Sequence, residues 1–283
     1  MNTTARSMYS DAVETAREYY NSEDADNFYF HIWGGEDIHI GLYRDKDEPI
    51  ADASRRTVAR MAGLLEDLGP DCRVLDLGAG YGGSMRFLAR EHGCQCVALN
   101  LSEVENERNR RINREQGLDD RIEVVDGDFA RLAWEDGRFD IVWSQDAILH
   151  SGERARVCAE AVRVLRPGGQ LVFTDPMQSD QADPACLQPI YDRIHLDSLA
   201  SPAFYRRTLD ELGLSLVSFE DHSEQLPRHY DRVRRELIAN ADDLRERGVS
   251  AEYIKRMQTG LGHWVDGGLR GDLVWGIFLF AKP

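Results

Sequence analysis

The chain has 283 residues, enough to bury a substantial core, and no Pro/Ser/Gly-rich linker divides it, so we expect one large domain with additions. Fifty acidic against 34 basic side chains give a formal net charge of −16, which argues against nucleic acid or anionic membranes as partners. The sequence contains no apolar run of about 18 residues and no secretory signal pattern near residue 1. We therefore expect a cytoplasmic protein without a membrane span.

The five cysteines form neither an even set nor a C-x-x-C pair, so the sequence predicts no disulfide framework and no metal site. Cys94 and Cys96 alternate along a predicted strand, and we expect both in the core.

The predicted elements begin with helices and continue with a regular alternation. Three helices, 11–20, 25–33 and 51–68, precede the first strand. Strands at 72–77, 95–101, 121–125, 139–144 and 170–175 then alternate with helices at 83–92, 103–116 and 153–165. This βαβ alternation predicts an α/β fold with a doubly wound, Rossmann-like parallel sheet that helices cover on both faces.

The last third of the chain follows a different pattern. A helix at 202–212 and a strand at 214–220 precede two polar helices across 228–257 and a closing apolar strand at 273–281. We divide the chain into an N-terminal helical lid (1–70), a ligand-binding core (71–221), a helical insertion (222–271) and a final core strand (272–283).

A glycine-rich turn, Gly78-Ala79-Gly80-Tyr81-Gly82-Gly83, directly follows the first core strand. Its spacing also satisfies the dinucleotide fingerprint, so glycines alone do not choose the ligand. Asp76 does, because a carboxylate repels a pyrophosphate but suits the ammonium and sulfonium of S-adenosylmethionine. The sequence therefore predicts S-adenosylmethionine as the cofactor.

The segment from Leu75 to Gly80 resembles the first motif of class I methyltransferases, and the later features agree with that family over about residues 70–220. The resemblance implies that cofactor contacts come from the first three strand ends. The implied residues are Asp76, Gly78, Ala79 and Gly80 at the turn, Asn100 and Leu101 at the ribose, and Asp128 and Phe129 at the adenine. A helix N-cap is the alternative role of Asp128.

The segment Gln145-Asp146-Ala147-Ile148-Leu149-His150 follows the fourth strand, where ligands of open α/β sheets gather. It resembles the matching part of phosphoethanolamine and of sarcosine/dimethylglycine N-methyltransferases. The resemblance implies that Gln145 contacts the cofactor and that Asp146 and His150 are catalytic residues of the acceptor pocket. The alternative for His150 is a core histidine bonded to backbone.

The sequence Trp33-Gly34-Gly35-Glu36-Asp37-Ile38-His39 resembles the lid of sarcosine/dimethylglycine N-methyltransferases. Aromatic faces attract alkylated ammonium groups and tolerate a sulfonium, which suits a lid over both ligands. We assign Trp33 to the cofactor and Tyr29 to the acceptor, and the related phosphoethanolamine enzymes imply a latch between Tyr20 and His150. Aromatic packing of helices is the alternative for the neighbouring phenylalanines.

Four further residues are candidates for the acceptor pocket. Pro176 and Met177 follow the fifth strand and offer no charge to an amine, so they suit a methylated nitrogen. Arg193 and His195 are candidates to bind an acceptor carboxylate. A solvated helix face is the alternative for charges in this region.

The resemblance implies methyl transfer to the nitrogen of sarcosine or dimethylglycine, a small-molecule amine, with the osmoprotectant glycine betaine as product. Phosphoethanolamine N-methylation and lipid or ring C-methylation use similar cores. An NAD-dependent oxidoreductase and a non-catalytic module for adenosyl ligands are the alternatives from other classes.

Overall fold

Alternating side chains give the central strands two apolar faces. In the computed structural model, which describes residues 17, 21, 24 and 28–283, Val74 and Trp143 belong to one buried cluster. Their chain neighbours Leu75 and Val142 belong to another. Because successive side chains of a strand point to opposite faces, both faces of the sheet need a cover of helices.

The strands form one seven-stranded sheet in the order β3-β2-β1-β4-β5-β9-β7. β1 to β5 pair in parallel, while β9 is antiparallel to both β5 and β7. The strands are β1 Arg73–Leu77, β2 Gln95–Asn100, β3 Ile122–Asp126, β4 Phe139–Gln145, β5 Leu165–Thr174, β7 Ser215–Asp221 and β9 Gly276–Ala281. The strand order reverses between β1 and β4, so a ligand crevice is expected at their carboxyl ends.

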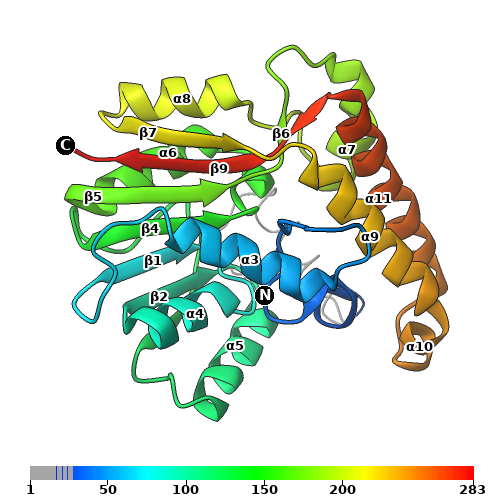
Figure 1. Ribbon diagram of the computed structural model, residues 1–283, viewed down its shortest axis with the longest axis horizontal. Helices are drawn as coiled ribbons and strands as arrows, with labels where there is room; N and C mark the ends of the chain where they lie inside the picture. The colour runs from blue at the N-terminus through cyan, green and yellow to red at the C-terminus, as the bar shows by residue number, and fades with distance from the viewer. Residues whose placement is uncertain (1–16, 18–20, 22–23, 25–27) are drawn as a thin grey trace, which may run out of the picture.

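Helices cover both faces of this sheet (Figure 1), which confirms the predicted α/β fold. The helices α3 (Ile50–Ala62) and α4 (Gly83–His92) pack on the face that contains Val74, and α6 (Arg154–Val164) and α8 (Pro202–Glu211) pack on the other. α5 (Glu103–Glu115) packs beside β2 and β3. Cys94 and Cys96 are buried under α4, as predicted.

A third apolar cluster joins the π-helix η1 (Tyr29–Gly34) to the helices that follow β5 and β7. These are α7 (Pro184–Ile194), α9 (Gln225–Ala239), α10 (Ala241–Glu246) and α11 (Ala251–Arg270). In Figure 1 this group lies to the right of the sheet, beyond the carboxyl ends of the parallel strands. A two-stranded sheet of β6 (Met177–Gln178) and β8 (Leu273–Val274) lies between this group and the main sheet.

Several predicted boundaries are wrong, for identifiable reasons. The helix expected at 51–68 ends at Ala62, where Gly63 forms the C-cap. The fifth strand, expected to begin at residue 170, begins at Leu165. Three helices replace the two polar helices expected across 228–257, and α11 continues to Arg270. Glycines near its end allow Leu273 and Pro227 to pack closely against it. α7 was not expected, but Asp183 caps it and Pro184 opens it.

Among the described residues, none of the helices has both the length and the apolar character that a bilayer requires. Only residue 17 of the predicted helix at 11–20 is described, whereas residues 28–33 of the predicted helix at 25–33 are described and include most of η1.

Replacing Phe278 with alanine tests how much β9 contributes to stability. Its ring is completely buried and stacks on Phe219 at 4.2 Å and on Phe173 at 5.0 Å between ring centroids. We expect Phe278→Ala to lower the free energy of unfolding by about 3–5 kcal/mol, measured by urea denaturation. Val217→Ala on β7, where the side chain is 57% exposed, is the control and should change it by about 0.5 kcal/mol or less. Equal losses in the two variants would contradict this account of the core.

Candidate active site

A cavity lies at the carboxyl ends of β1 and β4, where the strand order reverses. The glycine-rich turn forms one wall and the segment that follows η1 forms the other. The lining residues are Glu36, Asp37, Ile38, His39, Asp76, Gly78, Ala79, Gly83, Ser84 and Gln145. The predicted turn residues and the predicted lid therefore meet at one place.

The glycine-rich turn has a backbone that only glycine accommodates. Gly78 has a φ of +86°, and a Cβ there would lie 2.4 Å from the Cβ of Ala147. The N–H groups of Gly78 and Ala79 both donate to the carbonyl of Leu99, at 2.9 and 3.0 Å. Because these donors are already used, they do not provide a cradle for a pyrophosphate, and side-chain charge governs the choice of ligand.

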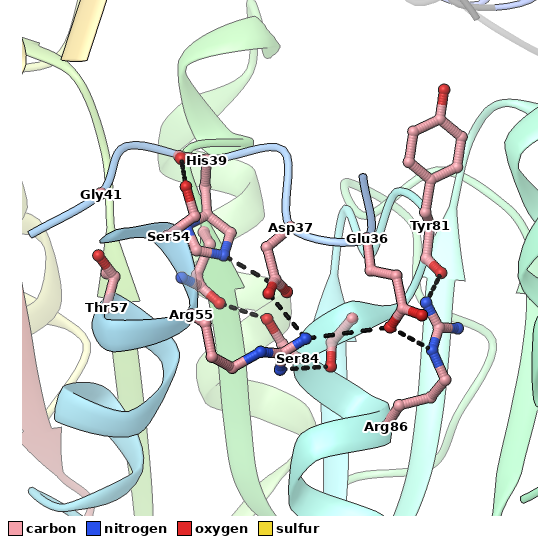
Figure 2. Close-up of polar contacts among 12 residues, drawn as sticks. Glu36, Asp37, His39, Gly41, Ser54, Arg55, Thr57, Tyr81, Ser84 and Arg86 are labelled. Carbon is pink, nitrogen blue, oxygen red and sulfur yellow. Dashed lines mark hydrogen bonds and ion pairs between the residues drawn. The ribbon is translucent and has the colours of Figure 1, made fainter. Parts of the chain in front are cut away.

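Two arginines hold the lid segment over this turn (Figure 2). Glu36 accepts from Arg86 Nε at 3.0 Å, and Asp37 forms an ion pair with Arg55 at 2.7 Å. Arg86 is completely buried and also donates to the carbonyl of Tyr81 at 2.6 Å. A buried cation needs a charged partner, so Glu36 is the group that allows Arg86 to lie inside the protein.

Within the described part of the chain, three buried polar atoms at the cavity make no hydrogen bond: Asp37 Oδ1, His39 Nε2 and Gln145 Nε2. The first two lie 3.8 Å apart. Gln145 Oε1 accepts from Ser84 Oγ at 2.5 Å and from Trp143 Nε1 at 2.9 Å, which fixes the amide. Burial also raises the pKa of Asp76 well above its usual value. Carboxylates and N–H donors around one cavity suit a ligand that carries both an ammonium and a carboxylate.

The residues assigned to the ribose and adenine lie at the ends of β2 and β3. Asn100 donates to Glu105 Oε2 at 2.8 Å, and Glu105 is buried. Glu105 was missed by the sequence analysis, although it completes an S-x-x-E capping pattern with Ser102. Asp128 Oδ1 accepts from the backbone N–H of Ala130 at 2.8 Å, but a turn and not a helix follows it, so Asp128 is not a helix N-cap.

The other cofactor contacts stay predictions. Leu101 and Phe129 are half-buried, and Phe129 approaches the position that a Cβ on Gly78 would take, with its Cε1 3.7 Å away. Gly80 has a φ of +51° beneath Ile38 of the lid segment. Trp33 lies in the apolar cluster that joins η1 to α9 and α11, and it does not line the cavity described above.

Asp146 connects the lid to the sheet. It has a positive φ of 50°, and its carboxylate accepts from Ile40 N at 2.7 Å, Thr174 Oγ1 at 2.8 Å and Trp275 Nε1 at 2.8 Å. Burial raises its pKa, while the nearby His39 and these hydrogen bonds oppose the rise. Since both oxygens already have donors, the arrangement favours a positioning role over direct proton transfer.

His150 ends the short helix η2 (Ile148–His150). Burial lowers its pKa to about 4, and the positive charges of Arg154 and Arg193 act in the same direction. Asp175 fixes this helix, because it accepts from Leu149 N at 2.9 Å and from the Tyr205 hydroxyl at 2.6 Å. Asp175 was not assigned from the sequence, although it directly follows β5 at the ligand edge of the sheet.

Burial raises the pKa of Asp175 to about 7, and the charge of Asp146 adds to the rise while the Tyr205 hydrogen bond opposes it. This carboxyl group therefore orders η2 without requiring a full negative charge near neutral pH.

The predicted acceptor residues are not all brought together. Arg193, half-buried on α7, donates to Met257 Sδ at 2.9 Å. Its positive charge contributes to the low pKa of His150. His195 is exposed at the C-cap of α7. Pro176 and Met177 are buried, and Met177 pairs with Val274 of β8.

Tyr29 is half-buried, with its ring centroid 5.3 Å from that of Trp33. Tyr20 lies outside the described residues, so its latch with His150 stays a prediction.

Comparison with known proteins agrees with this site. A family model described as a methyltransferase domain matches residues 75–173. The chain is 63% identical over 271 residues to the sarcosine/dimethylglycine N-methyltransferase of Halorhodospira halochloris, covering 96% of this chain and 97% of that protein. It is 52% identical to the enzyme of the same name from Aphanothece halophytica, covering 97% of this chain and 99% of that protein.

A solved structure from Galdieria sulphuraria, assigned as a sarcosine dimethylglycine methyltransferase, superposes with a TM-score of 0.88. That protein is 42% identical, and the match covers 93% of this chain and 98% of the other.

The fold and the site define a class I methyltransferase with S-adenosylmethionine as methyl donor. Within that class, the chain belongs to the sarcosine/dimethylglycine N-methyltransferase family.

Replacing Gly78 with alanine tests the turn. The added Cβ meets Ala147, and the left-handed backbone is strained for alanine. We expect Gly78→Ala to weaken binding of S-adenosylhomocysteine by about tenfold or more, measured by calorimetric titration. Gly213→Ala is a matched control, because Gly213 has a φ of +87° with nothing within 4 Å of an added Cβ. Unchanged affinity in Gly78→Ala would separate this turn from cofactor binding.

Proposed function

We propose that this enzyme transfers a methyl group from S-adenosylmethionine to the nitrogen of sarcosine or dimethylglycine, with glycine betaine as the end product. The observation that carries this proposal is the 63% identity over 96% of the chain to an enzyme named for these acceptors. A cytoplasmic location and a role in betaine biosynthesis and osmoprotection follow from the same proposal. Asp37 and Asp76 at the cavity also disfavour a phosphorylated ligand there.

The cavity residues fit the amino-acid end of the cofactor. Asp37 and Asp76 would hold its ammonium, and the amide nitrogen of Gln145 would donate to its carboxylate. Asn100, oriented by Glu105, would bind the ribose, with Asp128 and Phe129 at the adenine. When bound, S-adenosylmethionine supplies an electrophilic methyl group on a sulfonium.

The protein contributes mainly alignment of the acceptor nitrogen with that methyl group, an effect worth up to roughly 7–11 kcal/mol in favourable cases. Only the neutral amine has the lone pair that attacks. Burial lowers the pKa of His150 to about 4, so its imidazole is uncharged near neutral pH, and we assign it to accept the amine proton or to favour the deprotonated substrate. Asp175 and Asp146 position the segment that carries it.

An acceptor panel tests the proposal. We expect S-adenosylhomocysteine to form with sarcosine and dimethylglycine and the matching methylated products to appear by mass spectrometry. Phosphoethanolamine and lipid acceptors should give no product, because the relatives that cover nearly the whole chain are named for sarcosine and dimethylglycine. Turnover of phosphoethanolamine in preference to dimethylglycine would establish the alternative acceptor class.

His150→Gln tests the proton acceptor. We expect kcat/KM to fall by about 100-fold, with a ratio of wild type to variant that is constant from pH 6 to 9. The ratio should decrease only as the pH falls towards 4, where the wild-type imidazole becomes protonated. Titration of the substrate amine cancels in this ratio. A ratio of one at every pH would remove His150 from the chemistry, and a midpoint near 6.5 would show that burial does not lower its pKa.

A further inference from the structure

In the apolar cluster that joins η1 to α9, Trp33 packs against His229. Trp33 is 7% exposed and His229 is 0% exposed, and their ring centroids are 5.2 Å apart with the planes at 62°. The rings of Tyr29 and Tyr230 also contact Trp33, at 5.3 and 5.8 Å between centroids. Neither the cofactor cavity nor the proton-transfer residues include His229.

Hydrogen bonding fixes the tautomer of His229. The backbone N–H of Gly41 donates to His229 Nδ1 at 3.3 Å, and an amide N–H only donates. Nδ1 therefore carries a lone pair, and the ring proton is on Nε2. Burial lowers the pKa of His229 to about 3, so the ring stays neutral near pH 7. The Tyr43 hydroxyl also lies 2.9 Å from Nδ1.

The two N–H groups of this pair lack acceptors among the described residues. Both Trp33 Nε1 and His229 Nε2 are buried, and neither has a hydrogen-bond partner there. The completely buried tryptophans of the sheet differ, because Trp143 Nε1 donates to Gln145 and Trp275 Nε1 donates to Asp146. A buried N–H without an acceptor is destabilising, so two in contacting rings indicate a ligand with two acceptor oxygens.

This pair lies close to the segment that lines the cofactor cavity. His39 lines the cofactor cavity, Ile40 N donates to Asp146, and Gly41 N donates to His229. The three residues are consecutive, and two residues of chain span at most about 7 Å. A group held at His229 is therefore beside the lid segment that also borders the cofactor.

We propose that Trp33 Nε1–H and His229 Nε2–H bind the carboxylate of the acceptor amino acid, with Tyr29 and Tyr230 beside it. This inference rests on the proposed function, and it assigns acceptor recognition to two neutral donors on contacting rings. Arg193, the cation predicted for this role, is instead engaged by Met257 and the Arg256 carbonyl. An acceptor without a carboxylate leaves both N–H groups unpaired, which makes the pair a specificity determinant.

Three substitutions separate hydrogen bonding from packing. Trp33→Phe keeps an aromatic ring and removes the N–H. His229→Asn places an amide oxygen near the position of Nδ1, which keeps an acceptor for Gly41, and removes the Nε2 donor. His229→Gln places an amide nitrogen near the position of Nε2. Trp134→Phe is the control, because Trp134 packs against Phe139 in the core cluster between the sheet and α6.

We expect Trp33→Phe and His229→Asn each to raise the KM for dimethylglycine by roughly tenfold. The KM for S-adenosylmethionine should change by less than about twofold, and His229→Gln should recover part of the loss. The preference for dimethylglycine over dimethylaminoethanol, which has a hydroxyl in place of the carboxylate, should fall in the same two variants. Trp134→Phe should retain the wild-type KM and preference.

A spectroscopic measurement on the wild-type protein needs no active variant. The indole N–H resonance that Trp33→Phe removes should shift when dimethylglycine is added to the S-adenosylhomocysteine complex, and should stay in place with dimethylaminoethanol. Wild-type KM values in both variants, or an unmoved resonance, would overturn the inference and indicate a bound water at these donors. Absence of dimethylglycine turnover by the wild-type enzyme would instead contradict the proposed function.

Discussion

The carboxylate of Asp146 is the junction on which the site depends. It accepts hydrogen bonds from the lid at Ile40, from the end of β5 at Thr174, and from Trp275 just before β9. Three segments that are far apart in sequence thus converge on one side chain at the ligand edge of the sheet. The residues on either side of Ile40 have different contacts. His39 lines the cofactor cavity, and Gly41 donates a hydrogen bond to His229.

A second attachment holds the beginning of the lid. Arg86 is enclosed by the protein and Glu36 is its charged partner, so separating them would leave a buried cation, at a cost of about 3–5 kcal/mol. The segment from Glu36 to Gly41 is therefore ordered from both ends. Because these donors and acceptors are ordered before the ligands bind, binding costs less conformational entropy.

Local patterns were enough to predict the sheet and the glycine-rich turn, because each is encoded within a few neighbouring residues. Contacts between distant residues were not readable in the same way. His229 accepts from Gly41, which is 188 residues away in the sequence, and Asp175 after β5 accepts from Leu149 in η2. A local sequence pattern cannot predict either contact. Asp128 shows a further limit, because no helix follows it and its carboxylate instead accepts from Ala130 within a turn.

The position of β9 has a consequence for biosynthesis. β7 has β9 as its partner within the main sheet, and β9 also completes the edge of β5, yet it follows both in the chain. On the ribosome, β5 emerges about a hundred residues before the strand that covers its edge. An uncovered edge strand is prone to pair with other chains. The nascent protein therefore passes through an aggregation-prone stage, in which a chaperone would protect it.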